Sequence, residues 1–335
     1  MLELSFETVD DWCYKKDPWG GMKKKLFLAD QSFVPKGNEK NIEKMMMKRK
    51  PDWLKIQLPK GDDYSYVNGI VRDHGLHTIC SSGKCPNVGE CWGNGTATFM
   101  ILGNICTRAC KFCNVKTGKP LEADWKEPRR LAKSIKLMKL KHAVITSVDR
   151  DDLEDGGSGI WAETIKEIRK DNPTTTLEVL IPDFNGKKED IQRVIDEKPE
   201  VISHNLETVR RLTPEVRSRA KYDLSLQVLK QIADAGIVAK SGIMLGLGET
   251  EEEIYQVMDD LLAVGVKVMT IGQYLQPSRQ HLTVEEYVTP ETFKKYETVG
   301  LEKGFTFCES TPLVRSSYHA ERHVKALDLK DLAKK

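Results

Sequence analysis

The sequence predicts an α/β protein whose sheet is built mostly from parallel strands. From residue 98 onward, short apolar runs alternate with longer amphipathic stretches, and parallel strands need such crossover helices between them. The chain has 335 residues, of which 39% are hydrophobic, enough to bury the core of one large domain with extensions or of two ordinary domains. These observations leave two architectures open, a partial barrel and a doubly wound open sheet.

The repeating part of the chain is expected to hold six strands with helices between them, preceded by a helix over residues 64–76. Thr250 is the expected N-cap of the last of these helices, with Glu253 as its capping-box partner. The strands are predicted at residues 98–102, 143–147, 177–181, 201–204, 238–244 and 268–272. The helices between them are predicted at residues 129–140, 160–170, 188–197, 224–235 and 251–264.

Charge and hydropathy patterning argue against nucleic-acid and membrane partners. The formal net charge is +2, so there is no excess of positive charge to attract nucleic acid. No apolar run approaches the length that spans a bilayer, and the run after Met22 stops at Asp30, too early for a secretory signal. Cysteines without a secretory signal point to a reducing compartment, so we expect a cytoplasmic protein. Residues 1–50 are polar and interrupted by proline and glycine, which predicts a flexible extension.

Six of the eight cysteines lie between Cys80 and Cys113, in two triplets with the spacings C-x4-C-x5-C and C-x3-C-x2-C. A structural zinc ion normally takes four protein ligands from two closely spaced pairs, and neither triplet has that form. Three thiolates on one tight loop suit an iron–sulfur cubane that keeps one iron open for a small molecule. Structural zinc and a disulfide framework are the alternatives, and the missing secretory signal argues against disulfides.

The second triplet, Cys106-Thr-Arg-Ala-Cys110-Lys-Phe112-Cys113, resembles the signature of the radical S-adenosylmethionine (SAM) enzymes. The resemblance implies a partial (β/α)6 barrel of the TIM type with amino- and carboxyl-terminal extensions, and so decides between the two architectures. The first triplet and three further motifs resemble the lipoyl synthase family, in order from about residue 51 to about residue 322. These motifs are Ile145-Thr-Ser-Val-Asp-Arg-Asp-Asp-Leu153, Gly272-Gln-Tyr-Leu-Gln-Pro-Ser278 and Arg315-Ser-Ser-Tyr318.

The resemblance also divides the chain into parts. Residues 51–95 are expected to form an extension that carries the first triplet, and residues 96–308 to form the radical SAM partial barrel. Residues 309–335 are expected to form a carboxyl-terminal segment with the Arg-Ser-Ser-Tyr motif. Because glycine and proline recur within residues 80–93, we expect a wrapped loop there rather than a regular element.

The resemblance implies two [4Fe–4S] clusters and SAM as cofactors. One cluster binds SAM at its open iron and cleaves it to methionine and a 5′-deoxyadenosyl radical, whereas the other, auxiliary cluster gives up sulfur. A serine alkoxide is a harder ligand than a thiolate, which suits a cluster that must come apart. The implied ligands are Cys106, Cys110 and Cys113 for the radical SAM cluster, and Cys80, Cys85, Cys91 and Ser317 for the auxiliary cluster.

Most of the residues expected to hold SAM lie at the ends of predicted strands or just after them. Phe112 is expected beside the cluster or the adenine, and Arg219 and Lys240 are expected as partners for a carboxylate. For the polar residues the alternative is helix capping and solvated charge, for the two basic ones a surface ion pair, and for Phe112 core packing. No side-chain acid or base is expected to act in catalysis. The expected SAM contacts are Phe112, Thr146, Ser147, Asp149, Asn205, Glu207, Arg219 and Lys240.

The activity implied by the resemblance is insertion of two sulfur atoms at C6 and C8 of a protein-bound octanoyl-lysine, which forms the lipoyl cofactor. The implied partners are the lipoyl domains of 2-oxoacid dehydrogenases, the glycine-cleavage H protein, an electron donor and cluster-repair proteins. One alternative is another sulfur-inserting radical enzyme similar to biotin synthase. The other, from a different class, is a non-catalytic binding module stabilised by zinc.

Overall fold

The structure is a computed structural model that describes residues 49–55, 62–73, 75–83, 85, 87–93 and 97–317. The extension predicted for residues 1–50 therefore lies almost wholly outside the described residues, and so does Tyr318 of the carboxyl-terminal motif. Within the described residues, no helix is both long enough and apolar enough to cross a membrane.

A mostly parallel sheet of eight strands forms the centre of the described fold, in the order β1-β2-β5-β6-β7-β8-β9-β10. Only β1 runs antiparallel to its neighbour, and β1 and β10 are the two ends of the order among the described strands. All six predicted strands are confirmed, with ends that differ by one residue. The bounds are β1 His77–Thr78, β2 Ala97–Ile101, β5 His142–Ser147, β6 Thr176–Leu180, β7 Val201–Ser203, β8 Val238–Leu245, β9 Val268–Gln273 and β10 Phe307–Ser310. A second, two-stranded sheet pairs β3 Ile105–Cys106 with β4 Lys116–Thr117.

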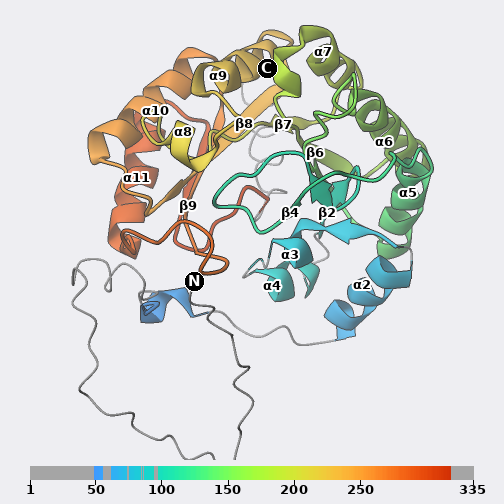
Figure 1. The fold of residues 1–335 in the computed structure, drawn as a ribbon, viewed down its shortest axis with the longest axis horizontal. Helices are drawn as coiled ribbons and strands as arrows, with labels where there is room; N and C mark the ends of the chain where they lie inside the picture. Colours follow the sequence, from blue (N-terminus) through green and yellow to red (C-terminus); the bar gives the residue numbers. More distant parts are fainter. Residues whose placement is uncertain are drawn as a thin grey trace, which may run out of the picture. The chain divides into compact units, whose positions relative to one another are not determined.

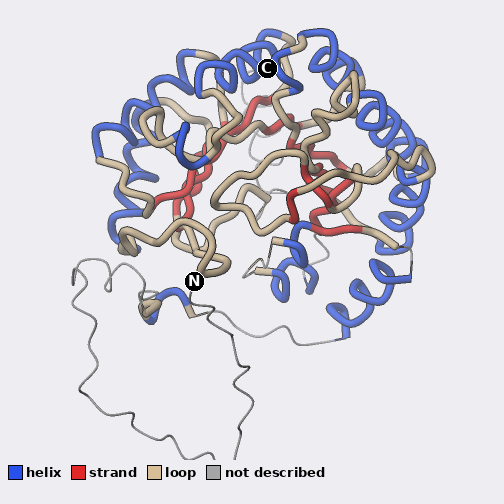
Figure 2. The backbone as a smooth tube through the Cα atoms, viewed as in Figure 1, coloured by secondary structure: helices blue, strands red, loops and turns tan. Residues whose placement is uncertain are grey.

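The longer helices follow one another in an arc around the outside of the strands (Figure 1), and the strands line the inside of that arc (Figure 2). Helices on one side of a curved parallel sheet are typical of a partial barrel rather than of a doubly wound sheet. The five predicted crossover helices are confirmed. The bounds are α2 Asp62–Asp73, α5 Glu127–Met138, α6 Ser158–Asp171, α7 Lys188–Asp196, α9 Tyr222–Asp234, α10 Glu251–Ala263 and α11 Pro290–Lys303.

Local sequence explains these elements. Every residue of β2 and of β9 is buried, as expected for strands covered on both faces. In α5 the buried Leu131, Ile135 and Met138 recur at helical spacing, so one face of the helix packs on the sheet. At the start of α10, the Thr250 hydroxyl accepts a hydrogen bond from the Glu253 N–H while the Glu253 carboxylate accepts one from the Thr250 N–H, which confirms the capping box.

The structure corrects the expectation of a loop over residues 80–93. Two short helices lie there, α3 Ile79–Ser82 and α4 Val88–Gly93. The Thr78 hydroxyl accepts a hydrogen bond from the Ser81 N–H and so caps α3. Helices of four and six residues are too short to show a period in the sequence, whereas the glycines that end them look like loop signals. The remaining short helices are η1 Asp52–Leu54, η2 Phe184–Gly186 and α8 Thr213–Val216.

Candidate active site

A cavity of about 470 Å³ opens at the carboxyl ends of the central strands, where parallel α/β folds place their ligands. The structure brings most of the predicted site residues to this one cavity. Residues from β5, β6, β7, β8 and β9, or from the loops that follow them, line its wall. The predicted residues in the lining are Cys106, Cys110, Phe112, Cys113, Thr146, Ser147, Asp149, Asn205 and Glu207.

Backbone contacts hold the loop of the second triplet in place. The Cys106 sulfur accepts hydrogen bonds from the Arg108 N–H at 3.4 Å and from the Asp149 N–H at 3.3 Å. The Thr107 N–H donates to the Asp149 carbonyl, and the Lys111 N–H donates to the Val216 carbonyl. Bonds from backbone N–H groups to a cysteine sulfur stabilise negative charge on it, as an iron ligand requires. The loop thus presents its thiols to the cavity in a fixed arrangement.

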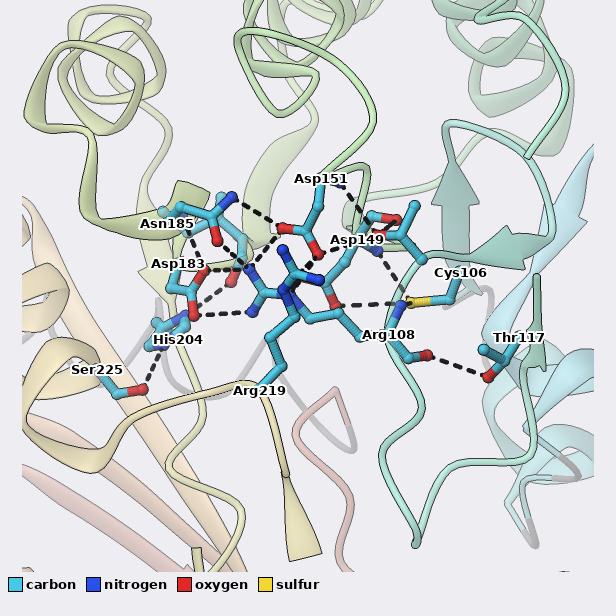
Figure 3. A network of polar contacts seen from close by, with 12 residues as sticks. Cys106, Arg108, Thr117, Asp149, Asp151, Asp183, Asn185, His204, Arg219 and Ser225 are labelled. Atoms are coloured by element: carbon cyan, nitrogen blue, oxygen red, sulfur yellow. Dashed lines mark hydrogen bonds and ion pairs between the residues drawn. The ribbon is translucent and has the colours of Figure 1, made fainter. Parts of the chain in front are cut away.

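Arg108, a residue that sequence analysis did not select, ties this loop to the strand ends (Figure 3). Its guanidinium bonds to Asp151 at 2.8 Å and, through both terminal nitrogens, to Asp183 at 2.7 and 2.8 Å. It also lies 3.4 Å from the Asp149 carboxylate and 3.1 Å from the Asn185 side-chain oxygen, with only 4% of the side chain exposed. A planar guanidinium suits such two-point pairing with carboxylates.

Burial and neighbouring charges shift the pKa values of the acidic and histidine side chains in this network. Burial acts to raise the pKa of Asp151, but the hydrogen bonds from Arg108 prevail and lower it to about 2. Burial raises the pKa of Asp149, against the attraction of Arg108. His204, behind Asp183, has its pKa lowered to about 4 by burial and by the charge of Arg217. Its Nδ1 lies 2.9 Å from the Ile181 carbonyl, which can only accept, so a neutral ring carries its proton on Nδ1.

Two buried polar atoms in the cavity wall have no hydrogen-bond partner among the described residues. They are the Ser147 hydroxyl at the end of β5 and the Asn205 side-chain oxygen after β7. The neighbouring Thr146 hydroxyl, in contrast, donates to the Leu180 carbonyl at 3.3 Å. Buried polar groups are normally satisfied, so Ser147 and Asn205 fit a polar ligand in the cavity.

Glu207 is held in an unusual backbone conformation beside the cavity. Its φ is 67°, yet its N–H donates to the Gly242 carbonyl and its carbonyl accepts from the Met244 N–H, so β8 fixes it on both sides. The Asn205 side chain donates to its carboxylate at 3.1 Å. Burial raises the pKa of Glu207, and the Arg217 guanidinium opposes that rise. A left-handed glutamate fixed in this way is typical of a functional site.

The two predicted basic contacts, Arg219 and Lys240, are not part of the cavity lining. Arg219 is 59% exposed and lies 3.3 Å from Asp151, which agrees with the surface ion pair considered as its alternative. Lys240 has no exposed surface and pairs with the buried Glu178, so the surface ion pair is wrong for Lys240. Arg217, which sequence analysis did not select, lines the cavity instead and donates to the Asn205 and Leu206 carbonyls.

The first triplet lies beside the carboxyl-terminal motif, 226 residues along the chain. The Asn87 side chain, between Cys85 and Cys91, donates to the Leu313 carbonyl at 2.7 Å. Burial raises the pKa of Cys85, and the nearby Arg315 guanidinium acts against that rise. Asn87 had no signal in the sequence pattern, whereas Arg315 belongs to the Arg-Ser-Ser-Tyr motif that the resemblance assigned to the auxiliary cluster. The structure therefore brings the first triplet and the start of the Arg-Ser-Ser segment together, with Ser317 half-buried at its end.

Burial raises the thiol pKa at five cysteines of the two triplets, namely Cys80, Cys85, Cys106, Cys110 and Cys113. Burial raises the pKa of Cys80 to about 11 and that of Cys110 to about 12. Metal ligation must therefore release protons. Among the described residues, no group of three or more His, Cys, Asp or Glu is gathered closely enough to hold a single metal ion. A four-iron cluster is larger than an ion and its cysteine ligands stand further apart, so this finding concerns single ions such as zinc.

The sequence profile of the Radical SAM superfamily matches residues 100–261. The lipoyl synthase of Phocaeicola vulgatus is 65% identical over 277 residues, which are 83% of this chain and 98% of that protein. The mitochondrial lipoyl synthase of Nematostella vectensis is 63% identical over 276 residues, which are 82% of this chain and 95% of that protein. Among solved structures, Streptococcus suis SuiB bound to S-adenosylmethionine superposes with a TM-score of 0.53 at 12% identity, over 76% of this chain and 57% of that one.

Proposed function

Because this chain belongs to the lipoyl synthase family of radical SAM enzymes, we propose how its residues divide the work of sulfur insertion between two sites. The family's reaction adds two sulfur atoms, at C6 and C8 of a protein-bound octanoyl-lysine, and forms the lipoyl cofactor. Identity above 60% with lipoyl synthases over most of the chain favours this activity over a biotin synthase-like reaction or a zinc-stabilised binding module.

The reacting carbons of an octanoyl chain are unactivated, so no side-chain acid or base can remove their hydrogens. A bound [4Fe–4S] cluster with SAM supplies a carbon radical for this purpose, and the auxiliary cluster supplies sulfur. The work left to the protein is to bind, orient and shield the reactants. The cavity contains buried carboxylates and hydroxyls for binding, and apolar side chains such as Phe112 and Ile181 that exclude water.

We assign Cys106, Cys110 and Cys113 as the ligands of the radical SAM cluster. The observation that carries this assignment is the convergence of all three thiols on the cavity that holds the unpartnered Ser147 and Asn205 oxygens. Those two oxygens, with the carboxylates of Asp149 and Glu207, are suited to the ammonium and ribose groups of SAM. Phe112 and Thr146 complete the wall that would contact it.

We propose that Arg217 pairs with the SAM carboxylate, and that the predicted Arg219 and Lys240 do not. Its side chain is buried at the cavity wall, and its charge acts on both Cys110 and Glu207. A guanidinium fixed by two backbone carbonyls loses little further freedom when it binds a carboxylate.

We assign Cys80, Cys85, Cys91 and Ser317 as the ligands of the auxiliary cluster. The bond from Asn87 to the Leu313 carbonyl and the proximity of Arg315 to Cys85 support this set, because they join the first triplet to the segment that ends at Ser317. Arg315 lines the cavity as well, so the two sites adjoin. An octanoyl chain in the cavity would thereby reach both.

The natural substrates are expected to be octanoylated lipoyl domains of 2-oxoacid dehydrogenases and the octanoylated glycine-cleavage H protein. An electron donor and cluster-repair proteins are the further partners that the proposed reaction requires, and the cytoplasm is the expected location. A carrier must deliver its octanoyl-lysine to the open end of the cavity. Binding of the isolated carrier domains to the loaded enzyme tests this expectation.

The assignment of the triplets is tested by anaerobic reconstitution with iron and sulfide, followed by assay with SAM, a reductant and an octanoyl-lysyl peptide. We expect about eight irons per chain, four for each cubane cluster. Cys85→Ala should lose the lipoyl product and keep SAM cleavage, whereas Cys110→Ala should lose both. Cys308→Ala is the control, because Cys308 is buried in β10 outside both triplets. Lipoyl product from Cys85→Ala at the wild-type rate would contradict the division of labour.

A further inference from the structure

A layer of polar side chains lies inside the barrel, beneath the cavity. It consists of Glu178 on β6, Ser203 on β7 and Lys240 on β8. Side chains two residues apart on a strand face the same side, and each of these residues precedes a cavity-lining residue by two positions. The side chains of this layer therefore face the barrel interior, two residues before the cavity wall along each strand. The lining residues that follow are Leu180, Asn205 and Gly242.

Glu178 and Lys240 form a buried ion pair in this layer. The Lys240 ammonium lies 2.8 and 2.9 Å from the two Glu178 carboxylate oxygens, and neither side chain has any exposed surface. The Ser203 hydroxyl donates to Glu178 at 2.7 Å. The ammonium also donates to the Ser316 backbone carbonyl at 2.5 Å, 76 residues along the chain. The ion pair thus reaches the carboxyl-terminal segment as well as the sheet.

This arrangement is hard to explain by stability alone. Removing two charges from water is costly, and a buried ion pair often stabilises a fold no better than apolar side chains of the same size. An apolar pair would fill the layer but would leave the Ser316 carbonyl without this donor. What the charged pair adds is a hydrogen bond that fixes the orientation of the Ser316 carbonyl. Buried polar groups retained for such specificity have precedent.

The carboxyl-terminal segment, residues 311–317, enters the barrel along a defined path. The Gln273 N–H donates to the Pro312 carbonyl at 3.1 Å, and Asn87 donates to the Leu313 carbonyl. The Val314 carbonyl packs directly against the Cα of Gly272, where any side chain would collide with it. Lys240 makes the next contact along this path, one residue before Ser317.

We propose that Lys240 is a positioning residue for the auxiliary site: through the Ser316 carbonyl it fixes the peptide that carries Ser317. Glu178 holds the Lys240 ammonium in place, and Ser203 holds Glu178. Lys240 does not itself line the SAM cavity, whereas Ser316, which it contacts, does, so SAM cleavage is measured beside the auxiliary cluster to separate the two sites. The inference rests on the proposed role of Ser317 as a cluster ligand.

The test is the double variant Glu178→Met with Lys240→Met, which keeps the layer filled without leaving one charge unpaired. We expect a folded protein in which hydrogen–deuterium exchange over residues 311–317 is about tenfold faster than in the wild type. The Mössbauer signal of the auxiliary cluster should change or fall, and lipoyl formation should drop by about tenfold, while SAM cleavage stays within about twofold. The control is the double variant Lys230→Met with Asp234→Met, which removes an exposed ion pair on α9.

A second double variant, Glu178→Gln with Lys240→Gln, covers the case that the methionine pair does not fold. Glutamine is one bond shorter than lysine, so it keeps the layer polar but withdraws the donor from Ser316. The same changes are expected, again with SAM cleavage retained. Wild-type exchange over residues 311–317 and an unchanged auxiliary signal in a folded double variant would overturn the inference. Equal loss of both clusters would also overturn it, because that pattern indicates a general structural role.

Ser317→Ala separates the inference from the function on which it rests. If Ser317→Ala changes the auxiliary Mössbauer signal and the double variants do not, Ser317 remains a ligand and the positioning role of Lys240 is wrong. If Ser317→Ala leaves the signal unchanged, the ligand assignment itself is wrong. Changes in both, with SAM cleavage kept, are the expected result.

Discussion

At the scale of single residues, Arg108 shows how one guanidinium can organise a catalytic loop. It lies inside the second triplet, yet its bonds go to carboxylates that follow β5 and β6 (Figure 3). These bonds fix the loop to the strand ends. This role could not be predicted from the sequence, because the partners Asp151 and Asp183 are 43 and 75 residues away from Arg108.

Replacing Arg108 by lysine tests this role. Lysine keeps the charge but cannot bond to Asp151 and Asp183 together, so buried carboxylates lose partners and unfolding free energy should fall by about 3 kcal/mol. Urea unfolding of the cluster-free protein measures this. Arg210→Lys is the matched control: Arg210 is 52% exposed in its pair with Asp223, so its replacement should cost under about 1 kcal/mol. Equal effects of the two replacements would contradict the account.

His204 predicts how stability depends on pH. Its folded pKa of about 4 lies below the ordinary value of 6.5, so between these pH values the unfolded chain binds more protons. Stability should rise with pH across this window and be lost as pH falls from 6.5 to 4, by roughly 3 kcal/mol from this residue. Urea midpoints at pH 7 and pH 5 should therefore differ more in the wild type than in His204→Gln. An identical pH dependence in the two proteins would show that His204 is not the group responsible.

Replacing Ser147 by alanine should weaken the binding of SAM without destabilising the fold. Its hydroxyl has no partner among the described residues, so Ser147→Ala removes no hydrogen bond within that part of the protein and should leave the unfolding temperature unchanged or slightly higher. If the hydroxyl bonds to SAM, affinity should fall by roughly tenfold. Calorimetric titration of SAM into the reconstituted enzyme checks this. The control is Ser134→Ala, whose hydroxyl donates to the Arg130 carbonyl on α5, outside the cavity lining. Unchanged affinity in Ser147→Ala would remove Ser147 from the site.

At the scale of elements, the regular repeats were predictable and the short connections were not. The strands β2 and β5 to β9 and the helices between them carry strong apolar patterns over enough residues to be recognised. The helices α3 and α4 do not, because their form depends on a cap at Thr78 and on packing around the first triplet. Helix α11, in contrast, carries recognisable end signals in the sequence: Thr289 as N-cap, Pro290 in the first turn and Gly304 after the end.

Gly272 tests the contact between β9 and the carboxyl-terminal segment. Its Cα packs against the Val314 carbonyl, and backbone cannot rotate away as a side chain can. Gly272→Ala should therefore displace residues 311–317 and reduce lipoyl formation, with a smaller effect on the radical SAM cluster. Iron content and hydrogen exchange measure this. Gly69→Ala in α2 is the control, because no atom lies within 4 Å of its added methyl group and alanine favours helix by up to about 1 kcal/mol. Wild-type activity in Gly272→Ala would contradict the path described for the segment.

At the scale of the whole described fold, one cavity adjoins residues of both proposed cluster sites. The cavity at the strand ends gathers the second triplet, and the carboxyl-terminal segment brings Arg315 to its edge. The cysteines of the cavity were predictable because their spacing is local. The environment of Lys240 was not, since nothing in a strand pattern tells whether a basic side chain faces solvent, a ligand or a buried carboxylate two strands away. The place of Arg217 in the cavity wall was unpredictable for the same reason.

The central claim is that the two sulfur atoms of the product come from a cluster that this protein binds and consumes. The most direct measurement is the mass of the lipoyl product from a single turnover of enzyme whose clusters were rebuilt with heavy sulfide, in buffer that contains only light sulfide. The account predicts product that carries two heavy sulfur atoms. Product that carries only light sulfur would show that the sulfur comes from elsewhere and would contradict the account.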